Sequence, residues 1–340
     1  MIRRLVLVAA LAACVMAPAS AAAQSKPLQA AVDWLRTQQQ ADGGFSNGFV
    51  PGSDPGATAD AVLAITSAGQ DAAQWTVGGN NPLDALRLAV EAGAVTGAGG
   101  FAKVALAVQA AGQDVRSFGG MDLTAAILAD RNAGAGLFGG GPYDTALAMQ
   151  ALRVAGADLP DGVIDGLLAT RLADGAYAFN GDRTPGTGDS NTTAMVVLAL
   201  WAAGETDAAA PSLEYFRSTQ NEDGGWTYQK PSAFGEATDA NSTALVMQAL
   251  AAAGEDLAAW NDPASALLSL QQPSGAFAFN AETPGDNLLA TVQAIPALAS
   301  PIEGRAQAGS ISVPLLGFIG LGLVLVAGLA ASVLRRRSAG

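Results

Sequence analysis

Histidine is missing from this 340-residue sequence, and cysteine occurs only once, at Cys14. The lack of histidine excludes serine–histidine and cysteine–histidine catalysis, together with zinc sites that combine Asp, Cys and His. A single cysteine excludes a disulfide framework. The stability of a folded domain must therefore come from a packed core, and we expect neither a metal site nor a cofactor.

Basic residues are also scarce. The segment 24–309 holds 30 acidic residues against 12 basic ones, a formal charge of −18. Such a surface disfavours nucleic acid and anionic lipid as partners, because both carry the same sign of charge.

The start of the chain predicts export. Arg3 and Arg4 precede an apolar run that ends in small residues at Ala21-Ala22-Ala23. This is the pattern of a secretory signal peptide over 1–23, with cleavage before Gln24. The string Leu-Ala-Ala-Cys at 11–14 leaves a lipoprotein-type cleavage before Cys14 open as the alternative.

The other end predicts a membrane anchor. An uncharged stretch runs from Leu315 to Leu334 and is followed by three arginines at 335–337. About twenty apolar residues span a bilayer as a helix, and flanking arginines favour the cytoplasmic side. We therefore expect a stalk over 300–312, a transmembrane helix over 313–334 and a cytoplasmic tail over 335–340. The predicted location is a single-pass cell-membrane protein with its N-terminal domain outside.

Between these ends, a Gly-rich turn that carries an aromatic residue recurs about every 48 residues. Its six copies are Asp42-Gly43-Gly44-Phe45, Gly99-Gly100-Phe101, Leu137-Phe138-Gly139-Gly140, Asp174-Gly175-Ala176-Tyr177, Asp223-Gly224-Gly225-Trp226 and Ser274-Gly275-Ala276-Phe277. Internal repeats of this period are typical of stacked helix pairs. We interpret the turn as structural, with glycines that allow a tight reversal and an aromatic ring that packs on neighbouring helices.

Each turn separates two kinds of predicted helix. The preceding helix is amphipathic, as in 28–38, while the following one is apolar all round, as in 190–204. A helix without a polar face must be buried on every side. Five of the apolar helices end in glycine, a residue that can close a helix in the left-handed conformation. We find no convincing strand, and twelve alternating helices predict an all-α (α/α)6 toroid over 24–299, with an open solenoid as the rival.

The motif resembles that of a known superfamily. Gln39-x-x-Asp42-Gly43-Gly44-Phe45 and Gln220-x-x-Asp223-Gly224-Gly225-Trp226 look like the QW-type repeat of the prenyltransferase and squalene-cyclase toroids. This resemblance implies an (α/α)6 toroid. The known chemistries of the superfamily need Asp-x-Asp-Asp, a zinc site or a Gly-Cys-Gly-Glu-Gln thioester motif, and none of these occurs here.

Polar residues gather in the loops that lead into the apolar helices. Asp189-Ser190-Asn191 is echoed by Asp239-Ala240-Asn241, and in part by Asp286-Asn287. In a toroid of parallel inner helices these residues lie at one end, beside helix N-termini whose free N–H groups carry partial positive charge. Helix capping also explains them. The candidate ligand-binding residues are Tyr143, Asp189, Asn191, Trp226, Tyr228, Asp239, Asn241 and Asn287.

The predicted function is binding without catalysis. The ligand is either a small molecule, such as an isoprenoid, a corrinoid or a glycan, or a surface protein. The alternative is a cryptic enzyme, terpene-cyclase-like or carbohydrate-acting, that uses carboxylates at the rim of the toroid. Its catalytic candidates are Asp144, Asp189, Asp239 and Asp286.

Overall fold

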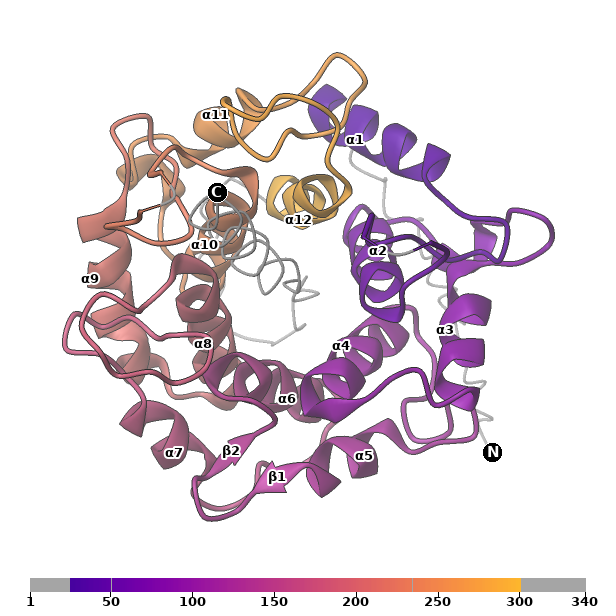
Figure 1. Ribbon diagram of the computed structural model, residues 1–340, viewed down its shortest axis with the longest axis horizontal. Coiled ribbons are helices and arrows are strands. Elements are labelled where there is room, and N and C mark those ends of the chain that lie inside the picture. Colours follow the sequence, from indigo (N-terminus) through magenta and orange to yellow (C-terminus); the bar gives the residue numbers. More distant parts are fainter. Residues whose placement is uncertain (1–24, 50, 234, 301–340) are drawn as a thin grey trace, which may run out of the picture.

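Twelve α-helices form two concentric rings in this computed structural model, which describes residues 25–49, 51–233 and 235–300 (Figure 1). The outer ring consists of α1 (Lys26–Thr37), α3 (Pro82–Glu91), α5 (Leu123–Ala129), α7 (Val163–Ala169), α9 (Ala210–Thr219) and α11 (Pro263–Leu268). The inner ring consists of α2 (Pro55–Ser67), α4 (Gly97–Ala110), α6 (Pro142–Val154), α8 (Ser190–Ala203), α10 (Ala240–Ala252) and α12 (Leu288–Ala299). Each inner helix packs against the next, and α12 packs against α2, so the ring is closed.

The difference in hydrophobic pattern accounts for the two rings. In α8, every residue from Ser190 to Leu200 is buried, whereas α1 buries one stripe made of Leu28, Ala31, Val32 and Leu35. An all-apolar helix is buried on every side only in the inner ring. An amphipathic helix packs its apolar stripe against the inner ring and turns its polar face to solvent. The glycines predicted to end the inner helices do adopt the left-handed conformation, with φ of 71° at Gly69 and 84° at Gly204.

Short elements complete the outer layer. Three single-turn 3₁₀ helices, η1 (Ala72–Gln74), η2 (Thr206–Ala209) and η3 (Leu257–Ala259), lie between inner helices and the outer helices that follow. The strands β1 (Arg131–Asn132) and β2 (Leu137–Phe138) pair antiparallel between α5 and α6. The prediction that the chain has no strand is therefore wrong at this one hairpin, where each strand is only two residues long and leaves no alternating pattern to detect.

The recurring turn is structural, as predicted, and a threonine explains how it is held. In five repeats the backbone N–H of the turn's aromatic residue donates to a threonine hydroxyl in the first turns of the inner helix that follows. In the fifth repeat, for example, Trp226 N lies 3.0 Å from Thr243 Oγ1. The five threonines are Thr58, Thr145, Thr193, Thr243 and Thr291.

In the fifth repeat, the same turn also contacts the repeat that follows. The side-chain amide of Gln220 donates to Gly224 O at 2.7 Å and also to the carbonyl oxygen of Trp260 in the next repeat. Gly224 has φ of 92°, and a Cβ placed on it would lie 2.0 Å from Asn261 O. Only glycine allows this approach, because any side chain would collide with the backbone of the next repeat.

Gly99-Gly100-Phe101 is not a turn, contrary to the sequence prediction, because all three residues lie within α4. The second repeat therefore passes from α3 to α4 through residues 92–96 alone, all of which the structure describes. A glycine pair beside an aromatic residue resembles the turn motif, but here the helical pattern continues through it.

The predicted signal peptide (1–23) and transmembrane helix (313–334) lie outside the described residues. Within the described residues, no helix is both long enough and apolar enough to cross a membrane.

Candidate functional site

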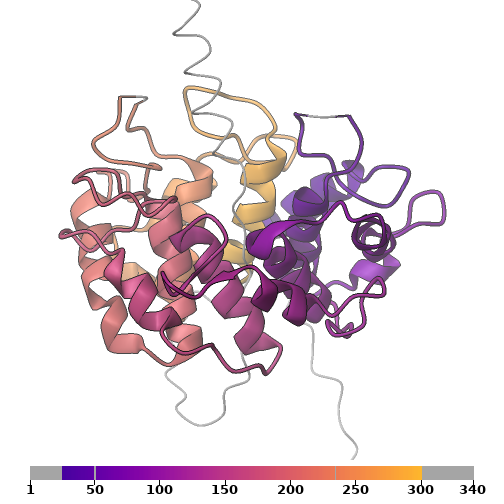
Figure 2. The same ribbon diagram turned by 60° about the horizontal axis from the view of Figure 1, so that its bottom comes forward.

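The loops before the inner helices collect at one end of the toroid, which we call the mouth (Figure 2). Side chains from these loops cap several inner helices there. Asp54 Oδ1 accepts from Ala57 N at 2.8 Å, Asp189 Oδ1 from Thr192 N at 2.7 Å and Asp239 Oδ1 from Ser242 N at 2.7 Å. Asn287 caps α12 by accepting from Ala290 N at 2.9 Å. Three of the predicted site residues, Asp189, Asp239 and Asn287, are thus helix caps, and the N–H groups that they bind are not free.

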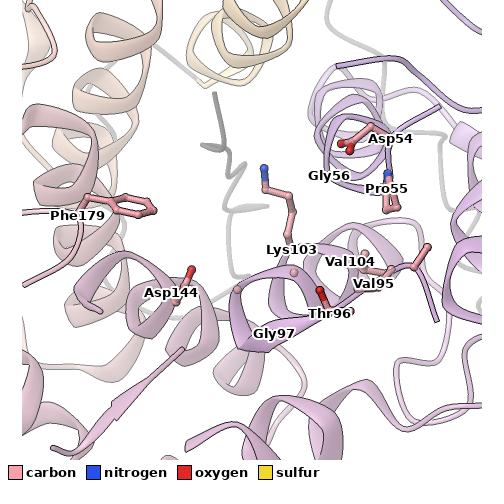
Figure 3. A pocket seen from close by; sticks show the side chains of 13 residues that line it. Asp54, Pro55, Gly56, Val95, Thr96, Gly97, Lys103, Val104, Asp144 and Phe179 are labelled. Atoms are coloured by element: carbon pink, nitrogen blue, oxygen red, sulfur yellow. The ribbon is translucent and has the colours of Figure 1, made fainter. Parts of the chain in front are cut away.

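A cavity of about 410 Å³ opens at the mouth between α2, α4 and α6. Three side chains that line it, Lys103, Asp144 and Phe179, converge on one space from different elements (Figure 3). Asp54 and Thr96 add polar atoms at its edge, and the remaining lining is mostly small: Pro55, Gly56, Ala94, Val95, Gly97, Gly99, Gly100 and Val104. A concave, mostly apolar site with a few convergent polar groups has the form of a small-molecule pocket.

The cavity lies at the inner helix that has no aromatic turn. The short loop 92–96 and the first turns of α4 supply eight of its lining residues. α4 begins at Gly97 without a side-chain cap of its own, and Asp130 at the end of α5 accepts from Ala98 N at 2.7 Å instead. The missing turn leaves this part of the mouth uncovered.

Asp144 sits among glycines on the wall of the cavity. Its Oδ2 accepts from Gly140 N at 2.7 Å. A Cβ placed on Gly99 would lie 2.2 Å from Asp144 Oδ1, and one placed on Gly139 would lie 2.5 Å from Oδ2. Burial raises the pKa of Asp144, and the nearby carboxylate of Asp130 adds to this effect, while the bond from Gly140 opposes it. A half-buried carboxyl with a raised pKa can exchange a proton with a ligand closer to neutral pH than an ordinary aspartate can.

Lys103, which lines the cavity, belongs to a buried ion pair. Lys103 Nζ lies 2.9 Å and 3.0 Å from the two carboxylate oxygens of Asp60, and their side chains are only 2% and 4% exposed. Burial raises the pKa of Asp60 to about 6, although the Lys103 ammonium favours the charged form. The pair joins α2 to α4, and losing either partner would leave a buried charge without compensation.

Tyr143 of α6 and Phe179 of the loop before α8 form an aromatic pair. Their rings pack with centroids 5.2 Å apart, and Phe179 faces the cavity. The Tyr143 hydroxyl has no hydrogen-bond partner among the described residues, although the side chain is only 2% exposed. Burial raises the pKa of Tyr143 well above its ordinary value, and the carboxylates of Asp60, Asp144 and Asp189 reinforce the shift.

Asp189 is surrounded by tyrosines. The pKa values of Tyr143, Tyr215 and Tyr228 are raised chiefly by burial and in part by the charge of Asp189. Burial raises the pKa of Asp189 itself to about 7, against the effect of hydrogen bonds from Thr192 and Tyr228. For Asp239 the same burial effect gives a pKa of about 6, opposed by bonds from Ser242.

The two predicted asparagines lie in the first turns of α8 and α10 and are both buried. Asn241 donates to Gln293 Oε1 at 2.8 Å, a bond that links α10 to α12. Asn191 Oδ1 has no partner among the described residues. Both asparagines lie at the mouth, but neither lines the cavity between α2, α4 and α6.

Two predicted site residues, Trp226 and Asp286, make contacts that stabilise the fold. Trp226 is fully buried, its Nε1 donates to Phe216 O at 2.9 Å, and its ring packs against Trp260. Asp286 binds the outer layer, since it accepts from Trp34 Nε1 at 2.9 Å and from Ser274 Oγ at 2.6 Å. Both are accounted for by these contacts, and we leave them out of the site.

Of the residues selected from the sequence, Asp144 alone lines the cavity. Sequence reasoning missed Asp54, Lys103 and Phe179. A signal existed for the lysine, because Lys103 is the only charged residue in α4 and Asp60 is the only one within α2. Opposite charges inside two all-apolar helices indicate a buried pair, since an isolated charge is too costly to bury.

Comparison with protein families finds no match, and comparison with curated proteins finds none either. Solved structures do match. A protein from Actinoplanes aligns with a TM-score of 0.60 at 16% identity, covering 81% of this chain and 98% of that one. The type II terpene cyclase MstE from Scytonema aligns with a TM-score of 0.59 at 16% identity, covering 82% and 98%.

A different enzyme class has the same architecture. An unsaturated glucuronyl hydrolase specific for heparin aligns with a TM-score of 0.58 at 12% identity, covering 80% of this chain and 95% of that one. Likeness at these identities concerns the fold and leaves function open. The chain has the α/α toroid fold of the type II terpene cyclases, as its repeat motif predicted.

Proposed function

We propose that this chain is an exported, membrane-tethered toroid that binds a small molecule in the cavity between α2, α4 and α6 without transforming it. The observation that carries the proposal is the cavity itself, which lies where the second repeat has no turn to cover its inner helix. Export and tethering rest on the sequence patterns over 1–23 and 313–334.

The chemistry of the lining supports binding. Small residues leave space, Phe179 offers an aromatic face, and Lys103 and Asp144 supply charged groups. The reactive groups that the prenyltransferase and squalene-cyclase chemistries require are missing from the sequence, including histidine and an Asp-x-Asp-Asp motif. The excess of acidic residues over 24–309 does not indicate a particular ligand. A net charge of this size favours solubility of the domain in water.

Mass spectrometry tests this proposal directly. The full-length chain, purified in mild detergent from its own host, is compared under native and denaturing conditions. We expect the native mass to exceed the denatured mass by that of one small molecule. A cavity-filling variant, Gly100→Leu, should lose this extra mass, because Gly100 faces the cavity and a Cβ there has room, 3.7 Å from Val95 Cγ1.

Ala125→Leu is the matched control. It adds a similar volume to the exposed face of α5 and should leave the extra mass unchanged. Equal occupancy in the wild type and Gly100→Leu would contradict the proposed location. An empty wild-type protein that also binds nothing from a broad ligand panel would contradict small-molecule binding and favour a protein partner.

A second candidate function is catalysis by a rim carboxylate. Asp144 favours it, since burial raises the pKa of this carboxyl beside the cavity. The fold neighbours include enzymes named as a terpene cyclase and a glucuronyl hydrolase. Incubating the released molecule with fresh protein separates the candidates. A change of its mass or of its NMR spectrum that Asp144→Asn abolishes would establish catalysis, because hydrolysis changes the mass whereas cyclisation changes only the bonding. An unchanged mass and an unchanged spectrum would support binding alone.

A further inference from the structure

We propose that the ligand of this cavity is an organic cation, such as an alkylammonium or guanidinium compound. This inference rests on the proposed binding function and specifies its ligand class. Charge balance and the aromatic wall support it separately.

The charge balance of the cavity is negative. Its one cationic side chain, Lys103, is neutralised by Asp60, because both carboxylate oxygens lie within 3.0 Å of Nζ. Asp54 and Asp144 also line the cavity, and among the described residues neither forms an ion pair with Lys or Arg. Asp130 lies near enough to influence Asp144 electrostatically. A cation entering this space would compensate carboxylates that form no ion pair within the described part of the chain.

The aromatic wall favours the same ligand. Elsewhere in the chain, arginines stack on the rings of tryptophans: Arg36 lies 4.2 Å from the centroid of Trp75, and Arg217 lies 3.9 Å from that of Trp260. Within the described part of the chain, no Lys or Arg stacks on Phe179, the ring that faces the cavity. A ring face beside carboxylates attracts a cation through its quadrupole.

An anionic ligand is the main alternative, because helix N-termini attract anions. Here the N-terminal N–H groups are already bound by carboxylates, Ala57 N by Asp54 and Ala98 N by Asp130. An incoming anion would therefore meet these carboxylates and Asp144 before it reached a free donor. The geometry favours a cation.

Three probes of matched shape test the ligand class. 2-Phenylethylammonium, 2-phenylethanol and phenylacetate share a phenyl ring on a short chain and differ in charge. Their binding to the full-length chain in detergent is measured by isothermal titration calorimetry and saturation-transfer NMR. We expect the ammonium compound to bind at least about tenfold more tightly than the alcohol, and phenylacetate to bind most weakly.

Charge-removing variants locate the effect. Asp144→Asn and Asp54→Asn should each weaken the ammonium compound about three- to tenfold and leave the alcohol unchanged. An asparagine at position 54 can still cap α2, so the fold should persist. Asp165→Asn, on the exposed face of α7, is the control and should change nothing.

The outcomes separate the two proposals. If the alcohol or phenylacetate binds as tightly as the ammonium compound, or if the aspartate variants leave the ratio unchanged, the ligand class is overturned. Gly100→Leu then decides whether the cavity is still the binding site. If no probe binds, the cationic class is overturned as well, and the proposed function also fails only if native mass spectra show an empty protein.

Discussion

The second and fifth repeats differ in what covers the start of their inner helices. In the fifth repeat, the turn from Asp223 to Trp226 folds over α10 and is held by Thr243, Gln220 and Asp223. In the second repeat the corresponding space has only the short loop 92–96, and Gly100 occupies the position of the threonine. One repeat uses its loop to join its neighbour, and the other leaves a cavity at the mouth.

This comparison indicates where function can reside in a ring of repeats. Turns that are pinned by buried hydrogen bonds have little freedom to change, because each contact also fixes the next repeat. The second repeat lacks the turn that the others share. Departures from a local sequence pattern tend to mark functional sites. Four predictions test the contrast, from the largest expected effect to the smallest.

Gly224→Ala should break the fifth repeat. The new Cβ would lie 2.0 Å from Asn261 O at a φ of 92°, so the backbone of the sixth repeat must move. We expect a loss of about 3 kcal/mol or more in the free energy of unfolding. Urea denaturation followed by circular dichroism measures it, and a loss below about 1 kcal/mol would contradict the close approach.

Thr243→Val should loosen the same turn without a steric clash. Valine has the shape of threonine but cannot accept the bond from Trp226 N, now 3.0 Å from the hydroxyl. Leaving this buried N–H unpaired should cost about 1–3 kcal/mol. Thr243→Ser keeps the hydroxyl and serves as the control. A loss in Thr243→Ser with none in Thr243→Val would show that the methyl group, and not the bond, matters.

Asp189→Asn tests the buried carboxyl that caps α8. The inner helix of the second repeat, α4, begins without a side-chain cap. Burial raises the pKa of Asp189 from about 3.8 to about 7, so between these values the folded chain keeps a proton that the unfolded chain has released. The contribution of this group to stability is therefore complete below pH 4 and is lost as the pH rises to about 7. Asp60 and Asp239, with pKa values of about 6, act in the same direction.

Asparagine can still cap α8 but does not titrate. We therefore expect Asp189→Asn to flatten the fall in melting temperature between pH 4 and pH 8, and to raise stability at pH 8 by about 1–3 kcal/mol. Asp165→Asn, on the surface of α7, should leave the slope unchanged. A wild-type protein whose stability rises over this range would contradict the raised pKa values of these buried carboxyls.

Gly100→Ala should be mildly stabilising, in contrast to Gly224→Ala. Gly100 lies inside α4, and a Cβ there would make an ordinary contact, 3.7 Å from Val95 Cγ1. Replacing a helical glycine by alanine typically gains about 0.5–1 kcal/mol. Thermal unfolding measures the change. A destabilisation would mean that the cavity wall near Gly100 is tighter than its geometry indicates.

The sequence predicted the ring because the ring rests on periodic patterns. The apolar run of α8 and the single apolar stripe of α1 each need a particular layer, and the repeated turn sets their spacing. The caps were predictable for the same reason, since Asp189 and Asp239 directly precede apolar helices.

The cavity was not predictable, because it follows from contacts between repeats. Nothing in the local sequence indicates that Gly99 lets Asp144 approach it, or that Phe179 turns towards α4 from the loop before α8. The pattern Gly99-Gly100-Phe101 was misleading for a related reason: a motif of small residues fits both a turn and the crowded start of an inner helix. Lys103 was the one overlooked residue with a clear signal.

The contact that closes the ring also governs how the repeats depend on one another. Gln271 in the last repeat donates to Pro27 O at the start of α1, and Gly275 packs against Ala30 in the same helix. An open array can lose a unit and remain a shorter array, because its end units are capped. A closed ring has no end unit. Removing any helix pair would therefore leave a gap with an apolar helix face exposed on each side, and the remaining repeats would have to change their packing angles to close it. The number of repeats is thus fixed by geometry, and this architecture can vary through its loops but not through its length.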